Sequence, residues 1–223
     1  SVGKMIAMAV DSVGNDGAIS IEDGKSSETH LDIVEGFRFD SGYFARAFVT
    51  DERKGAIHYD NSLVLVTDQK IDSVEEILPV LELVARENKP FVIVAEEVEG
   101  QALAALIMNT VRGTMKIAAV KAPRYGEERR SILEDLCLSV GATFVSRRSG
   151  MSLRDVNLNH LGVCKKVEVL KSSTTIVGGN SDYEKIEERI DSLKSQIRES
   201  DDLSRCSQLQ DRITRLSSGV AII

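Results

Sequence analysis

Few residues of this chain have the types and the spacing that enzymes use for chemistry. The three histidines, His30, His58 and His160, lie far apart in the sequence, and none belongs to a recognised nucleophile or metal-binding motif. We therefore predict that each is a surface or loop residue. The chain also has no GxxxxGK[ST] phosphate loop and no GxGxxG turn after an apolar run, so we predict no nucleotide or metal site within it.

A pair of acids, Glu96 and Glu97, is the best candidate for acid-base chemistry. The pair follows the apolar run 91–95, and α/β enzymes place their active sites at the carboxyl ends of strands. Stabilisation of a following helix start by negative charge is the simpler interpretation. An α/β enzyme that uses this acidic edge remains the alternative hypothesis.

Composition excludes several classes of protein. The 28 basic and 35 acidic residues give a net charge of −7, whereas nucleic-acid binding needs a basic face. No apolar run approaches the roughly 18 residues of a membrane span, so we expect a cytoplasmic chain with neither nucleic acid nor membrane as a partner. The cysteines are odd in number and widely spaced, which predicts reduced, mostly buried thiols at Cys137, Cys164 and Cys206.

The elements that would position such residues alternate along the chain, which predicts an α/β fold. Short β-branched runs, typical of buried strands, occupy residues 62–67, 91–95, 116–121 and 142–145. Helical patterns separate them at residues 73–87, 100–112 and 127–140. This order predicts βαβ units with a parallel sheet covered by helices, followed by a strand pair at 163–170 and 174–177.

Both ends of the chain have their own patterns. Two apolar stripes, between residues 183 and 197 and between 203 and 216, predict a C-terminal antiparallel helical hairpin. Residues 2–13 have helical periodicity and residues 18–21 alternate like a strand. Because the chain starts inside an amphipathic segment and stops on the apolar run 220–223, we expect it to be a piece of a longer protein.

The predicted helices 73–87 and 100–112 carry more apolar residues than one sheet-facing stripe needs. In the second helix, Leu106 and Val111 can face the sheet, whereas Leu103, Ile107 and Met108 cannot all do so. Two helices on one face of a sheet would then form an apolar groove suited to peptides with apolar side chains. The alternative is a helix pair buried on all sides by another layer.

At these helices the sequence resembles the group I chaperonins of the GroEL type, along the whole chain. Specific matches include VEGFRFDSGY at 34–43, ILPVLE at 77–82, IVAEEVEG at 93–100 and AAVKAP at 118–123, together with 13–24 and 218–221. The resemblance implies an apical polypeptide-binding domain at 35–220. It also implies part of an intermediate domain at 1–34 and a return to that domain at 221–223.

The resemblance further implies a chaperone function. Its binding residues for non-native polypeptides and a GroES-like co-chaperonin would be Tyr43, Ala45, Ala47, Phe48, Leu78, Leu81, Leu103, Ile107 and Met108, with hinges at Gly36 and Gly219. The full-length subunit would assist protein folding in a homo-oligomeric ring, using ATP and magnesium bound outside this chain. The fragment itself is expected to be no enzyme and to hold no cofactor.

Several residues depart from the family pattern. The family usually has serine at 45, proline at 46 and tyrosine at 47, where this chain has Ala45, Arg46 and Ala47. These changes predict a smaller and more positive edge of the groove. Ser41 and the Arg124-Tyr125 pair also depart from the family, which predicts altered contacts between subunits.

Overall fold

A mixed six-stranded sheet lies at the centre of residues 36–220, the part of the chain that the computed structural model describes. Across the sheet the strands are ordered β1 (Phe37–Phe39), β8 (Thr174–Gly178), β7 (Gly162–Val169), β2 (Ile57–Val66), β4 (Phe91–Ala95) and β6 (Ile117–Lys121). Strands β2, β4 and β6 are parallel, whereas β2–β7, β7–β8 and β8–β1 pair antiparallel. The predicted α/β class and the parallel βαβ units are confirmed, and the predicted strand pair forms the antiparallel hairpin β7–β8, because its short link allows no crossover.

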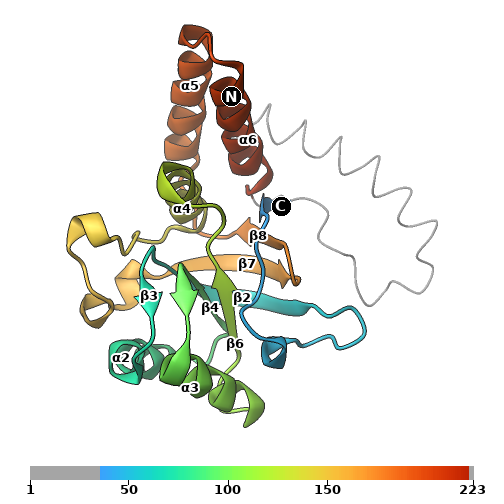
Figure 1. Cartoon of the computed structure of the whole chain (residues 1–223), viewed down its shortest axis with the longest axis vertical. Coiled ribbons are helices and arrows are strands. Elements are labelled where there is room, and N and C mark those ends of the chain that lie inside the picture. Colours follow the sequence, from blue (N-terminus) through green and yellow to red (C-terminus); the bar gives the residue numbers. More distant parts are fainter. Residues whose placement is uncertain (1–35, 221–223) are drawn as a thin grey trace.

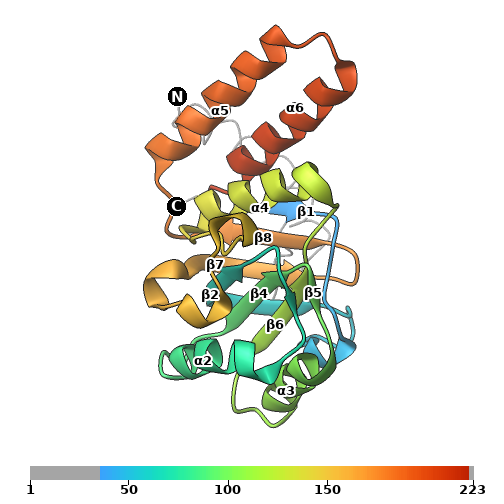
Figure 2. The same ribbon diagram turned by 60° about the vertical axis from the view of Figure 1, so that its left-hand side comes forward.

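The helices α2 (Val74–Ala85) and α3 (Gly100–Val111) lie side by side at one end of the molecule (Figures 1 and 2). Each connects two neighbouring parallel strands in the same direction across the sheet, and right-handed crossovers then place both helices on one face. A small parallel pair, β3 (Lys70–Ile71) and β5 (Glu97–Val98), precedes the two helices in turn.

The helix α4 (Gly126–Val140) packs against β2, β7 and β8, and all five residues of β4 are buried. It ends at Gly141, whose left-handed φ of 74° favours glycine. Apolar side chains of the strands and of these helices form the core, which explains why β4, most of β6 and the last residues of β2 are continuous apolar runs.

The predicted C-terminal hairpin is confirmed as α5 (Tyr183–Glu199) and α6 (Leu203–Ser218). Asp182 and Asp202 each accept hydrogen bonds from two backbone N–H groups at the start of these helices. The two helices run side by side and contact α4 (Figure 2). Each buries an apolar stripe, Ile186, Ile190 and Leu193 on α5 and Leu209, Ile213 and Leu216 on α6.

The predicted strand at 142–145 is wrong. Only Val145 forms a bridge, to Thr67 of the chain beyond β2. The side chain of Ser146 then accepts a hydrogen bond from Arg148 N, which starts the first of three short 3-10 helices, η2 (Arg147–Ser149), η3 (Leu153–Asp155) and η4 (Leu158–His160). The predicted helix 2–13 and strand 18–21 lie outside the described residues.

Among residues 36–220, no helix combines the length and the apolar character that crossing a bilayer requires.

Candidate functional site

The outward side of α3 is apolar and carries no charge. From Gly100 to Val111 the helix contains no charged residue, and only Ala102 and Leu106 are buried. Ala102 and Leu106 are buried, whereas Met108 is 52% exposed and Val111 is 70% exposed. Leu103 and Ile107 lie between these two extremes, half-buried against the core.

The position of Val111 corrects the predicted orientation of α3. At about 100° per residue, Val111 lies opposite the stripe that Ala102 and Leu106 form, so it points away from the sheet. Leu103, Ile107, Val111, Ala104 and Met108 follow one another around the helix and leave no polar gap. We call these five residues, together with Leu78 of α2, the apolar face.

On α2 the two predicted binding residues, Leu78 and Leu81, differ in exposure. Leu78 is 46% exposed, whereas Leu81 is 4% exposed and belongs to the core. Leu81 shares one helical stripe with Ile77 and Val84, which are fully buried, and Leu78 lies at the edge of that stripe. The prediction that Leu81 is available to a partner was therefore wrong, and the exposed apolar surface of α2 is smaller than expected.

The third predicted part of the site, residues 43–48, lies beside α3. The short helix η1 (Arg46–Phe48) packs against α3 and β6, and Ala47 is exposed. Ala45 is half-buried, and Phe48 is fully buried, so the predicted contact of Phe48 with a partner was wrong. Tyr43 is half-buried and its hydroxyl donates to Gly55 O at 3.2 Å.

A basic cavity of about 530 Å³ adjoins this segment. Its charged lining consists of four cations and one carboxylate, Arg38, Arg46, Lys54, Lys171 and Asp40, and Tyr43 forms part of its wall. Sequence reasoning identified only Tyr43 and Arg46 among these residues. The others come from β1 and the residue after it, from the chain before β2 and from the β7–β8 link, and only the folded sheet brings them together.

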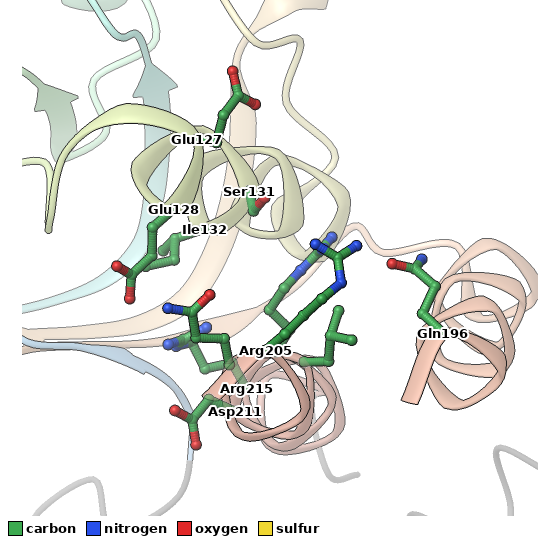
Figure 3. A pocket seen from close by; sticks show the side chains of 11 residues that line it. Glu127, Glu128, Ser131, Ile132, Gln196, Arg205, Asp211 and Arg215 are labelled. Carbon is green, nitrogen blue, oxygen red and sulfur yellow. The ribbon is translucent and has the colours of Figure 1, made fainter. Parts of the chain in front are cut away.

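A second cavity, of about 340 Å³, lies between α4 and the hairpin (Figure 3). Its lining is charged on both sides: Glu127 and Glu128 come from α4, and Arg205, Asp211 and Arg215 come from α6. Burial lowers the pKa of Arg215, and its Nη1 has no hydrogen-bond partner within residues 36–220. This lining suits polar groups and has no apolar surface comparable with that of α3.

The acidic pair at the end of β4 is held by arginines. Oε1 of Glu96 lies 3.5 Å from Arg129 and Oε2 lies 2.9 Å from Arg147, so both carboxylate oxygens have cationic partners. Glu97 is half-buried in β5, where it lies opposite Lys70 in the backbone pairing with β3. The contacts of Glu96 join β4, α4 and η2, which is a structural role.

The histidines and cysteines within residues 36–220 form no cluster with acids that could hold a metal ion. Nδ1 of His160 accepts from Asn157 N at 3.0 Å, and His58 lies 3.6 Å from Glu168 on the neighbouring strand. The predicted burial of most of the cysteines is confirmed, with Cys137 and Cys164 buried and Cys206 half-buried. His30 lies outside the described residues.

The two predicted hinge glycines lie in tight packing. A Cβ on Gly36 would lie 2.7 Å from Thr175 Cγ2, and a Cβ on Gly219 would lie 3.1 Å from Cβ of Phe37. Both glycines are buried, and Gly219 O accepts a hydrogen bond from Gly178 N at 3.0 Å. Close approach of neighbouring chain segments therefore accounts for glycine at both positions.

A scan of the chain against models of known protein families gives no match.

Proposed function

We propose that this chain binds exposed apolar segments of non-native polypeptides through the apolar face of α2 and α3. The observation that carries the proposal is the uncharged outer side of α3, where Met108 and Val111 are more than half exposed. A surface helix is normally polar on its outer side, and a contiguous exposed apolar patch is typical of an interaction site.

The energetics of this face favour weak and sequence-tolerant binding. Full burial of an apolar side chain contributes about 1.5–3 kcal/mol, and partly exposed side chains such as Leu103 and Ile107 contribute less. Two or three such anchors, after the cost of ordering the peptide, allow capture of many different apolar segments. Methionine adapts its shape easily, so Met108 suits a surface that must accept varied guests.

The resemblance to group I chaperonins extends the proposal to the longer protein. In it this chain would be the apical domain of a cytoplasmic chaperonin subunit, and the same face would bind a GroES-like co-chaperonin. The subunit would form a ring with identical copies and would use ATP and magnesium bound outside this chain.

Binding of a fluorescent apolar peptide to the wild type and to the double variant Met108→Glu/Val111→Glu tests the proposal. Both residues are exposed, so the variant should remain folded while two carboxylates interrupt the apolar face. We expect an affinity at least about tenfold lower, which corresponds to the loss of about 1.4 kcal/mol of binding free energy.

Leu203→Glu provides the matched control, because Leu203 is 85% exposed but lies on α6, away from α2 and α3. It should bind the peptide like the wild type. Equal affinity of the wild type and a folded Met108→Glu/Val111→Glu variant would contradict the proposal.

A further inference from the structure

The basic cavity beside η1 contrasts with the charge of the chain as a whole. The chain has a net charge of −7, yet four of the five charged residues that line this cavity are cations. The one carboxylate of the lining, that of Asp40, lies 3.4 Å from Arg124. Arg124 is not part of the lining, so a cation outside the cavity offsets the negative charge of Asp40. The cavity therefore presents a local positive potential.

Two of the cations have no acidic partner in the described part of the chain. Arg38 and Lys171 are exposed and form no ion pair within residues 36–220. Arg46 lies 4.0 Å from Glu52, but both side chains are largely exposed, and water and salt weaken such a pair.

Polar groups inside the cavity converge on one place. A Cβ on Gly55 would lie 3.8 Å from both Arg46 Nη1 and Tyr43 Oη, so the guanidinium and the phenol flank the same short stretch of backbone. Ser172 and Ser173 of the β7–β8 link complete the wall. Guanidinium, ammonium and hydroxyl groups together are donors that suit carboxylates.

The cavity and the apolar face both adjoin the short helix η1. Tyr43 and Arg46 line the cavity, and Arg46 opens η1, which packs against α3. In Figures 1 and 2 the short blue helix that follows β1 lies beside α3 in both views. Ala47, the residue after Arg46, is exposed, so no large side chain of η1 stands between α3 and the cavity at this position.

We propose that this cavity binds acidic residues that flank the apolar segment of a bound polypeptide, so that the chain prefers segments in which apolar and acidic stretches adjoin. The inference rests on the proposed function, since the apolar face supplies the first anchor. Arg38 and Lys171 are the residues assigned to this preference.

Two labelled peptides test the inference, each with the same apolar segment followed by a short run of either glutamates or glutamines. At about 20 mM salt the glutamate peptide should bind the wild type about tenfold more tightly, and the difference should fall to about twofold at about 500 mM salt, where screening is strong. In Arg38→Gln/Lys171→Gln the difference should also fall to about twofold. The control Lys185→Gln/Lys194→Gln removes two exposed charges from α5 and should keep the wild-type preference.

The outcomes separate the two proposals. Equal binding of both peptides to the wild type at low salt, or a preference that survives Arg38→Gln/Lys171→Gln, would overturn the inference and leave the apolar face in place. The proposed function would be overturned if the glutamine peptide did not bind, or if it bound Met108→Glu/Val111→Glu as tightly as the wild type. Displacement of the glutamate peptide by an oligonucleotide at lower concentration than by polyglutamate would identify a phosphate site and would also overturn the inference.

Discussion

Asp135 of α4 is a fully buried charged residue, and it joins α4 to the hairpin. Its Oδ1 lies 2.8 Å from Arg189 of α5, and its Oδ2 lies 2.7 Å from Nε of Arg212 on α6. Burial tends to lower the pKa of Arg212, but the hydrogen bonds and charge of Asp135 outweigh it, so that pKa is raised. One carboxylate thus holds both helices of the hairpin.

Removal of this charge should destabilise the protein strongly. In Asp135→Asn two buried or half-buried guanidinium groups lose their counter-charge, and breaking a buried ion pair typically costs about 3–5 kcal/mol. Urea unfolding followed by circular dichroism measures the loss. Asp191→Asn, an exposed acid on α5, should change the free energy of unfolding by less than about 0.5 kcal/mol, and an equal effect of both substitutions would contradict this role.

The buried thiols make stability dependent on alkaline pH. Burial raises the pKa of Cys164 to about 12 and raises that of Cys137 further above its usual value. A raised folded-state pKa means that the unfolded chain releases these protons first, so stability is intact below about pH 9 and declines as pH rises toward 12. Each thiol contributes about 1.4 kcal/mol of loss per pH unit in that range.

Thiol alkylation at pH 8 checks the burial behind this prediction. In the folded protein Cys206 should react with iodoacetamide well before Cys137 and Cys164, which should react only on unfolding. Mass spectrometry of the labelled peptides gives the order. Urea midpoints at pH 8 and pH 10 then give the slope, and a midpoint unchanged between them would contradict the linkage.

At the scale of a single helix, α2 offers a sharp comparison between two leucines three residues apart. Leu81→Ala should destabilise the protein by about 2–5 kcal/mol because it leaves a cavity in the core. Leu78→Ala should cost less than about 0.5 kcal/mol, yet it should weaken binding of the apolar peptide. Thermal unfolding and peptide titration of the two variants separate the roles, and similar unfolding free energies would contradict the assignment of Leu81 to the core.

The same helix shows what sequence patterns could and could not predict. The predicted helices 73–87 and 127–140 match α2 and α4, whose ends are fixed locally: Ser73 accepts a hydrogen bond from Glu75 N, and α4 ends at Gly141. The rotation of α2 and α3 about their axes was not predictable, because both helices are apolar on nearly every side. Leu81 was therefore predicted to be exposed and Val111 to face the sheet, and both predictions were wrong. The prediction that apolar side chains remain exposed on these helices was correct.

At the scale of the whole molecule, three segments meet at Gly178. A Cβ there would lie 2.3 Å from Ser139 O of α4 and 3.2 Å from Gly219 O at the end of α6. Both contacts are with backbone, which cannot rotate away. Strand β8, α4 and the end of the hairpin can therefore pack this closely only because residue 178 has no side chain.

Gly178→Ala should therefore destabilise the protein by more than about 2 kcal/mol, since the backbone of α4 must move. Gly179→Ala is the matched control, because a Cβ at the next position meets ordinary contacts at 3.6 Å. Differential scanning calorimetry of both variants gives the comparison. Equal melting temperatures would show that α4 is less tightly fixed against β8 than the contacts indicate.

The mixed sheet was only partly predictable at this scale. Spacing along the chain predicted the βαβ units that form β2, β4 and β6, because parallel neighbouring strands need helix-length connections. The pairing of β1 with β8, more than a hundred residues apart, has no local signal. The basic cavity depends on that pairing, since Arg38 lies on β1 and Lys171 follows β7.

The contact between Phe37 and Gly219 places the first strand and the end of the last helix at one point. Figures 1 and 2 show this point on the side of the sheet away from α2 and α3. The two ends of the described region, at Gly36 and Val220, therefore lie together, and a peptide bound at the apolar face of α2 and α3 would contact neither of them.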